Sequence, residues 1–267
     1  NYTEENIQLA VKEWQKVKST YDQLHLKLDL AGALDVEPSV VPEIEALMNQ
    51  FVEALEDDLV IPFHYFGITD IDGVDLQGVN LDDISEVASR LMINRRVDFI
   101  IDKMNFYGYD GKFRKLLGFC VSIEHAIFMA KRFNELNIPS IALTSKSTIE
   151  ERNKAKENLV NGNIKFIFVV DLYNEGVDIP EVNTILFLRP TESLTVFLQQ
   201  LGRGLRLSEG KECLTVLDFV GQAHKNYSFE DKFRALIGKT NKPVKDYVEN
   251  GFLTLPKGCY IQLEKEA

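Results

Sequence analysis

Apolar residues near the start of the chain recur at helical spacing. Every seventh position from 7 to 28 is apolar, and a second set is offset from the first by three, which predicts a long amphipathic helix over residues 4–30. A second apolar repeat follows Pro42, at Ile44, Leu47, Phe51 and Leu55. Proline is well tolerated in the first turn of a helix, so we predict a second helix here. We expect the two helices to form an antiparallel hairpin whose apolar seam packs within the protein.

The pattern then changes to short apolar runs that alternate with helical segments. Residues 59–70 are rich in aromatic side chains and predict a strand, and 70–83 is a polar connection with glycines. From about residue 91, the pattern predicts strands at 116–120, 140–143, 165–170, 184–187 and 213–219, with helices at 123–136, 148–160 and 193–201. This alternation is typical of an α/β domain, a parallel sheet with helices on both faces. We therefore expect three parts: an acidic helical hairpin extension at 1–58, a connecting strand and loop at 59–90, and the α/β domain with a C-terminal tail at 91–267.

The chain has 267 residues and a net charge of −11, and the charge is unevenly distributed. Residues 1–100 hold 7 basic and 20 acidic side chains, whereas residues 101–267 hold 23 and 21, so the acidity belongs to the first third. A domain that contacts phosphates locally needs a few well-placed donors and not a basic total. The charge of the second part is therefore compatible with nucleic-acid binding.

Composition argues against several other classes of protein. The three cysteines are far apart and form no CxxC pair, and the four histidines show no metal-ligand spacing, so we expect neither disulfides nor a metal site. We expect a cytoplasmic protein, since no apolar run reaches the roughly 18 residues of a membrane span and no signal peptide is evident. The absence of an initiator methionine suggests either a fragment of a longer protein or N-terminal trimming.

Two arginines near the end of the predicted helix 193–201 form the most informative pattern. Arg203 and Arg206 are three residues apart, a spacing that places both on one face of a helix. A guanidinium keeps its charge and donates two parallel hydrogen bonds to phosphate oxygens. The pair therefore suits a triphosphate, although it could also complement the dipole of its own helix.

Three further segments follow predicted strands. Strand 165–170 leads into a loop that contains Asn174, Gly176 and Asp178, in which the carboxylate could accept a hydrogen bond from a ribose hydroxyl, or the loop could be a plain turn. Ser122 follows strand 116–120 as a potential helix N-cap. Thr144 and Ser145 follow strand 140–143, ahead of a capping box made by Ser147 with Glu150 or by Thr148 with Glu151. Helix N-termini bind anions, so both places could bind backbone phosphates, or they could be caps only.

In this order, these segments resemble the conserved motifs of superfamily 2 helicases. Gln199, Gly202, Arg203 and Arg206 are similar to motif VI, which supplies arginine fingers to an ATPase. The Gly176–Asp178 loop resembles motif V, which contacts ATP ribose and nucleic acid. The stretch around Ser122 resembles motif IV, and Thr144 with Ser145 resembles the phosphate-contacting loop after it. The chain from about 90 to 220 thus resembles a C-terminal RecA-like lobe of DEAD/DEAH-type, ResIII-like helicases, a resemblance that stretches 62–67 and 118–126 also support.

The sequence lacks the other half of such an ATPase. The one GK[ST] sequence, Gly238–Thr240, has Phe233 where a Walker A loop has glycine, and Leu172 occupies the glutamate position of a Walker B motif. The resemblance implies that ATP and Mg²⁺ bind between two lobes, with Mg²⁺ held by a separate N-terminal lobe. We therefore expect no ATPase activity from this chain alone.

The resemblance implies that the chain is the C-terminal lobe of an ATP-dependent helicase or translocase. Its residues fall into three groups: catalytic Arg203 and Arg206; ATP-binding Gly176, Asp178, Gln199 and Gly202; and nucleic-acid-binding Ser122, Thr144, Ser145 and Asn174. The expected partner is nucleic acid, with DNA favoured over RNA, bound through its phosphates. Two alternatives remain open: a non-enzymatic RecA-like interaction module that binds partners through the acidic hairpin, and a duplex DNA translocase subunit of a restriction system.

Overall fold

The structure, a computed structural model, describes residues 51–71, 74, 76, 79–80, 83–170, 179–189, 194–220, 236 and 255–264. The chain divides into two compact units, residues 1–59 and 60–267. Residues 51–56 are helical, in agreement with the end of the second predicted helix. The rest of the predicted hairpin, residues 1–50, lies outside the described residues.

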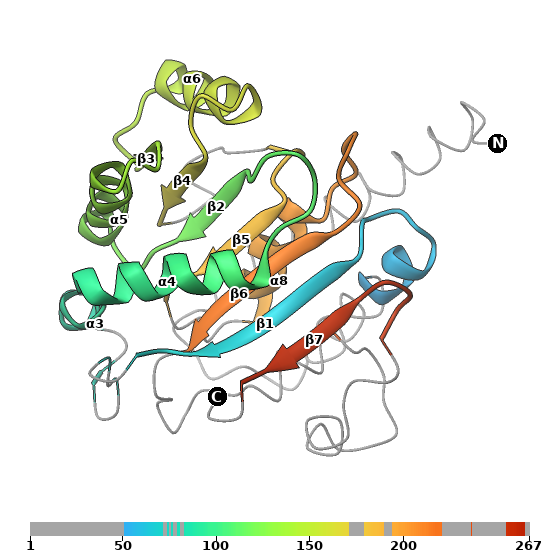
Figure 1. The fold of residues 1–267 in the computed structure, drawn as a ribbon, viewed down its shortest axis with the longest axis horizontal. Helices are drawn as coiled ribbons and strands as arrows, with labels where there is room; N and C mark the ends of the chain where they lie inside the picture. The colour runs from blue at the N-terminus through green and yellow to red at the C-terminus, as the bar shows by residue number, and fades with distance from the viewer. Residues whose placement is uncertain are drawn as a thin grey trace, which may run out of the picture. The chain divides into compact units, whose positions relative to one another are not determined.

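The second unit is built on a seven-stranded sheet in which every strand pairing is parallel (Figure 1). The strand order is β3-β4-β2-β5-β6-β1-β7. The strands are β1 (Phe63–Thr69), β2 (Leu116–Phe119), β3 (Ser140–Ala142), β4 (Phe166–Val169), β5 (Thr184–Phe187), β6 (Leu214–Val220) and β7 (Tyr260–Leu263). The predicted parallel α/β sheet is therefore confirmed.

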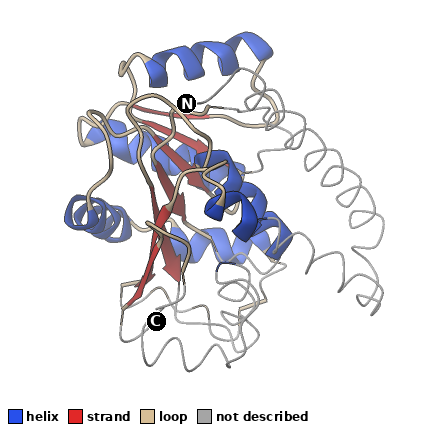
Figure 2. Cartoon of the chain, turned by 90° about the vertical axis from the view of Figure 1, so that its right-hand side faces the viewer, coloured by secondary structure: helices blue, strands red, loops and turns tan. Residues whose placement is uncertain are grey.

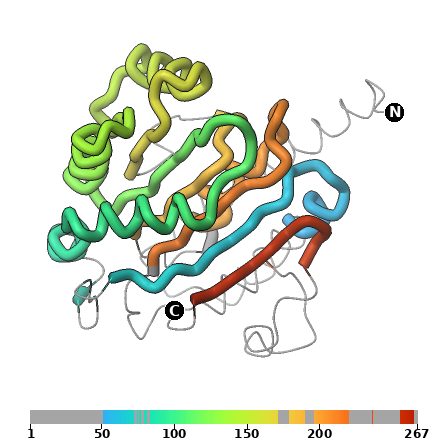
Figure 3. Tube along the Cα trace, viewed as in Figure 1, coloured from blue at the N-terminus to red at the C-terminus, as the bar shows by residue number. Residues whose placement is uncertain are grey.

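The aromatic-rich strand expected at 59–70 is β1, and it lies inside the sheet. It pairs with β6 on one side and with β7 on the other, so segments from both ends of the second unit lie side by side (Figure 3). Strand β7 is short and lies within the C-terminal tail, where we predicted no element. Its pairing with β1 places residue 260 next to residue 64, a long-range contact that local pattern does not indicate.

Helices cover both faces of the sheet (Figure 2). They are α3 (Ile84–Leu91), α4 (Asn94–Tyr107), α5 (Ile123–Glu135), α6 (Ile149–Val160) and α8 (Leu194–Gly204). Helices α4 and α5 pack against the face that carries Leu116, Phe168 and Leu217. Helix α8 packs against the opposite face, where the ring of Phe197 lies 5.1 Å from that of Phe187. Helices α3 and α4 were not predicted.

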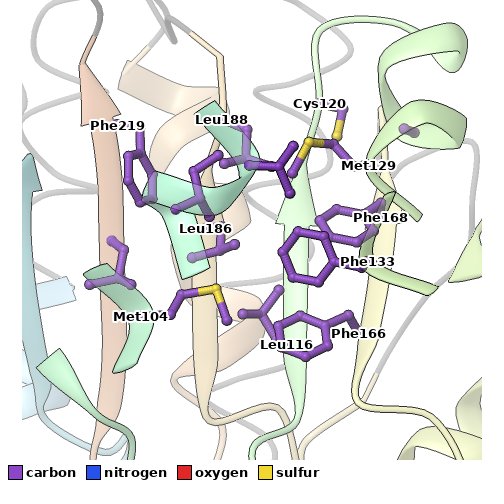
Figure 4. Close-up of a cluster of buried hydrophobic side chains, with 14 of the residues drawn as sticks. Met104, Leu116, Cys120, Met129, Phe133, Phe166, Phe168, Leu186, Leu188 and Phe219 are labelled. Atoms are coloured by element: carbon purple, nitrogen blue, oxygen red, sulfur yellow. The ribbon is translucent and has the colours of Figure 1, made fainter. Parts of the chain in front are cut away.

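The main core lies between the sheet and helices α4 and α5 (Figure 4). Phe133 of α5 contacts the rings of both Phe166 and Phe168, whose centroids lie 5.0 and 5.1 Å away. The neighbouring residue in β2 is Gly118, where an added Cβ would lie 2.6 Å from the Phe168 ring. Aromatic side chains contribute large buried areas, so this stack fixes β2 and β4 side by side. The carboxyl ends of these two strands are thereby held next to each other, and the Cys120 N–H donates to the Val169 carbonyl at 2.8 Å.

Candidate functional site

The arginine pair lies at the end of α8. The helix is held on the sheet by buried Phe197, Leu198 and Leu201, and it ends at Gly204. Arg203 is in its last turn, whereas Arg206 follows the helix, and both side chains are half-buried. The prediction that the two arginines share one helical face is therefore wrong, because the helix ends between them.

Gly204 ends the helix in close contact with the sheet. An added Cβ there would lie 2.5 Å from the side chain of Leu214 and 2.8 Å from that of Ile185. The next residue, Leu205, is buried, and its carbonyl accepts a hydrogen bond from the Ile61 N–H at 2.9 Å. The backbone between the two arginines is thus fixed to β5, β6 and the segment that precedes β1.

A buried lysine completes this arrangement. The ammonium of Lys211, a residue that is 8% exposed, donates to the carbonyls of Pro180, Val182 (2.9 Å) and Gly204 (3.0 Å). Burial lowers the pKa of Lys211 to about 8, against the raising effect of Glu181 and with a further lowering by the charge of Arg206. At neutral pH the side chain is therefore still a cation, and Arg206 lies near enough to influence it.

A second buried polar residue, Asn183, holds the same edge of the sheet. Its amide Nδ2 donates to the carbonyls of Asp110 (2.6 Å) and Phe113 (2.8 Å), and its Oδ1 accepts from the Lys115 N–H (2.9 Å). The carboxylate of Asp110 accepts from the backbone N–H groups of the two residues after Lys211, at 2.5 and 3.3 Å. Three separate segments, 110–115, 183 and 211–213, therefore meet at the amino ends of β2, β5 and β6.

Ser122 lies at the other edge of the sheet, where it caps α5. Its hydroxyl accepts from the His125 N–H at 3.1 Å, as the N-cap prediction requires, and the residue is buried. The neighbouring Glu124 carboxylate has a lowered pKa, through a hydrogen bond from its own backbone N–H and one from Ser122. A carboxylate of the protein thus already lies at this helix N-terminus.

Buried charge lies beneath this cap. Arg96 of α4 donates through Nε to the Asp70 carboxylate at 2.7 Å, and both side chains are at most 1% exposed. Burial lowers the pKa of His125 to about 3, and the charge of Arg96 acts in the same direction. His125 is therefore neutral, and its Nδ1 accepts from the Val121 N–H at 3.4 Å.

The turn after β3 leaves more surface accessible. Thr144 is buried, and its Oγ1 accepts from the Lys146 N–H at 3.2 Å. Arg152 of α6 donates to the carbonyls of Thr144 (3.2 Å) and Ser147 (3.1 Å). Ser145 and Lys146 are exposed at the tip of this turn. The capping box of α6 is formed by Thr148 with Glu151, one of the two predicted pairs.

The candidate residues therefore divide between two opposite edges of the sheet. Ser122 and Thr144 follow β2 and β3 at the carboxyl edge. The arginine pair lies at the amino edge. Gly204, between the two arginines, and Val182, just before β5, both accept hydrogen bonds from the Lys211 ammonium. Of the other expected ATP-binding residues, Gln199 is half-buried on α8 and Gly202 is exposed. Asn174, Gly176 and Asp178 lie outside the described residues.

Sequence reasoning missed Lys146, Arg152, Asn183 and Lys211. The run from Thr144 to Thr148 offers one signal, a lysine among hydroxyl residues, that could have identified Lys146 as a phosphate-binding candidate. No local signal marks Lys211 or Asn183, because each acts on segments distant in sequence.

Within the ranges given above, no group of three His, Cys, Asp or Glu side chains could hold a metal ion. None of the helices in that part of the chain combines the length and the apolar character that crossing a bilayer requires.

Comparisons with known proteins identify a family that the chain resembles. The family model for the helicase conserved C-terminal domain matches residues 98–208, which include Ser122, Thr144, Arg203 and Arg206. A 51.5 kDa protein of Lactococcus phage (isolate 7-9) is 28% identical over 197 residues, 72% of this chain and 39% of the phage protein. The putative ATP-dependent helicase IRC3 of Saccharomyces cerevisiae is 30% identical over 134 residues, 50% of this chain and 19% of the yeast protein. The chain thus spans well under half the length of each.

Two solved structures share the fold. The ATP-dependent Type ISP restriction-modification enzyme LlaBIII bound to DNA gives a TM-score of 0.55 at 19% identity, over 80% of this chain and 16% of that chain. A fragment of a putative HsdR subunit of a type I restriction enzyme from Vibrio vulnificus YJ016 gives 0.52 at 18% identity, over 78% of this chain and 38% of that chain.

Proposed function

We propose that this chain is the C-terminal RecA-like lobe of an ATP-dependent superfamily 2 helicase or translocase, because the family model for the helicase conserved C-terminal domain matches residues 98–208. In this proposal ATP binds between the amino edge of the lobe and a separate N-terminal lobe. When bound, ATP would supply the γ-phosphoryl group, whose transfer to water drives movement. The second lobe would bind Mg²⁺ and make the remaining contacts to the phosphates.

The fixed backbone around the arginine pair is the observation that carries the proposal. The Gly204 carbonyl accepts from the Lys211 ammonium, and the Leu205 carbonyl accepts from the Ile61 N–H. The backbone between the two arginines therefore cannot shift without breaking those bonds. Preorganised cations aimed at developing phosphate charge are the main means by which such enzymes accelerate phosphoryl transfer. Two half-buried guanidiniums on a fixed backbone suit the phosphates of ATP.

Four other residues complete the proposed ATP contacts. We assign Asp178 to the ribose hydroxyls and Gly176 to the turn that allows this approach. Gly202 is exposed one residue before Arg203, and no atom lies within 4 Å of an added Cβ, which leaves space for a ligand beside the helix. Gln199 lies one turn earlier on α8, where it is half-buried.

We assign the carboxyl edge to the nucleic-acid backbone. Exposed Ser145 and Lys146, on a turn held by Arg152, are suited to bind phosphates. We assign Thr144 and Asn174 to the same partner. We also assign Ser122, at the start of α5, to this partner. The Glu124 carboxylate already accepts hydrogen bonds there, so a phosphate would have to compete with it. Contacts to phosphates carry no base information, so this edge predicts little sequence preference. Competition between DNA and RNA oligonucleotides of one sequence would distinguish the two partners.

Removal of one arginine tests the proposal. In the two-lobe protein, we expect Arg206→Ala to lower the ATP turnover rate by about 10³ to 10⁵ while ATP binding is largely kept, because the lost cation acts on the transition state. Arg90→Ala is the matched control, since Arg90 is a half-exposed arginine of α3 paired only with Glu86 among the ion pairs seen, and turnover should stay within twofold.

Two outcomes would contradict this assignment. Turnover of Arg206→Ala within tenfold of the wild type would remove the arginine from the ATP site. ATP hydrolysis by this chain alone would show that the chain has a complete site of its own.

A further inference from the structure

The three hydrogen bonds of Lys211 connect two parts of the proposed ATP site. Two of its carbonyl partners belong to residues 180 and 182, two and four positions after Asp178. The third belongs to residue 204, which lies between Arg203 and Arg206. An ammonium group carries three protons, and here each has one backbone acceptor.

The contact with Gly204 has a structural reason of its own. The last carbonyls of a helix have no partner within the helix, and a cation there also complements the helix dipole. Lys211 lies outside α8 and supplies both the hydrogen-bond donor and the positive charge at Gly204, the last residue of the helix. The end of α8 is therefore held by a residue seven positions further along the chain.

The backbone that carries Lys211 is itself well fixed. Its N–H donates to the Ser208 carbonyl at 3.2 Å across a turn in which Gly210 has a φ of 73°. The next two N–H groups donate to the Asp110 carboxylate. Lys211 thus extends from a rigid support, which a residue needs if it is to position others.

We propose that Lys211 is the positioning residue of the arginine pair, holding Gly204 against residues 180–182 so that Arg203 and Arg206 keep a fixed position on the lobe. This inference rests on the proposed function. The side chain does not contact ATP in this arrangement. It acts through the backbone, and a displacement of about 1 Å in such a support lowers the rate by about 100-fold.

The test compares Lys211→Met with Lys115→Met in the two-lobe protein. Methionine matches the length of the lysine chain but cannot donate to the three carbonyls. Lys115 is a neighbouring cation that makes none of these three bonds, although its charge also influences Lys211. We expect Lys211→Met to lower kcat by about 10- to 100-fold with KM for ATP changed by less than about threefold, and Lys115→Met to leave kcat within twofold.

The decisive readout is turnover per nucleotide-binding site, counted by titration with a fluorescent ADP analogue. A merely structural role would reduce the number of binding sites and leave turnover per site unchanged. A positioning role leaves sites that bind ADP but turn over slowly. Turnover per site within twofold of the wild type in Lys211→Met would overturn the inference.

A second variant covers the case in which Lys211→Met does not fold. Lys211→Gln keeps two donors on a shorter side chain, so we expect a kcat between those of the wild type and Lys211→Met. Wild-type turnover per site in Lys211→Gln, or failure of both variants to fold, would overturn the inference. Arg206→Ala measured in parallel separates the two proposals: if it is inactive while Lys211→Met is fully active, only the role of Lys211 fails.

Discussion

The turn at residues 144–147 and the segment at residues 204–211 carry candidate residues at opposite edges of one sheet, and they are held in different ways. In the turn, every bond that we describe joins residues at most eight positions apart, including those from Arg152. The segment 204–211 is held by partners 29 and 31 positions away and by Ile61, which lies ahead of β1.

The two regions should therefore differ in how far substitutions elsewhere in the protein alter their shape. A turn closed by its own side chains keeps its shape as long as its few residues are present. The segment with the arginine pair keeps its shape only while the sheet, the 108–115 loop and residues 180–183 remain in place. We therefore expect ATP turnover to depend on distant residues, and binding at residues 144–147 to depend on near ones.

The largest effect is expected for Asn183→Ala. The substitution removes the partners of the Asp110 and Phe113 carbonyls and of the Lys115 N–H, and unsatisfied buried groups cost about 1 to 3 kcal/mol each. Since water can reach some of these groups, we expect a loss of about 2 to 4 kcal/mol in the free energy of unfolding. Urea denaturation of the full chain measures this loss.

The matched control for this prediction is Asn163→Ala. Asn163 is an exposed asparagine that bonds the side chain of Asn158, five positions away, so we expect a change below about 0.5 kcal/mol. Equal losses for the two variants would show that long-range bonds are no more important here than local ones. That result would remove the distinction between the two edges.

Sequence and structure agree best where the determining contacts are local. The caps at Ser122 and Thr148 were predictable because a hydroxyl and its N–H partner lie three residues apart. The strands β2 to β6 were predictable because buried parallel strands are continuous apolar runs between turns. The parallel sheet with helices on both faces followed from their alternation with helices.

The parts that sequence did not reveal depend on distant contacts. Lys211 has no feature in the sequence that separates it from an exposed lysine, because its three acceptors belong to backbone segments brought together by the fold. The end of α8 at Gly204 was missed for the same reason, since its packing on Leu214 and Ile185 depends on neighbouring strands. Arg203 and Arg206 were identified by spacing, but their surroundings were not.

The second prediction concerns two glycines of α8 that differ in their surroundings. Gly204→Ala would place a Cβ 2.5 to 2.8 Å from Leu214 and Ile185, and overpacking of this kind costs about 1 to 3 kcal/mol. Gly202→Ala meets nothing within 4 Å, so it should gain about 0.5 to 1 kcal/mol of stability through higher helix propensity. Thermal unfolding of both variants measures the difference.

A Gly202→Ala variant that is more stable yet turns over ATP more slowly would indicate that Gly202 faces the ligand. Equal destabilisation by both substitutions would contradict the packing argument.

The smallest expected effect concerns Lys146 at the tip of the 144–147 turn. Because its ammonium would contact a backbone phosphate, we expect Lys146→Gln to remove one counterion-releasing contact. The magnitude of the slope of log K against log salt concentration should then fall by about 0.7 to 0.9.

Lys131→Gln is the control, because Lys131 is an exposed lysine of α5 that lies 4.0 Å from the Glu135 carboxylate. Fluorescence anisotropy with a labelled oligonucleotide at several salt concentrations gives the slopes. Since the turn is closed by hydroxyls and by Arg152, neither substitution should change stability by more than about 0.5 kcal/mol. An equal change of slope for both lysines would mean that the nucleic acid responds to overall charge and that the local turn provides no specific phosphate site.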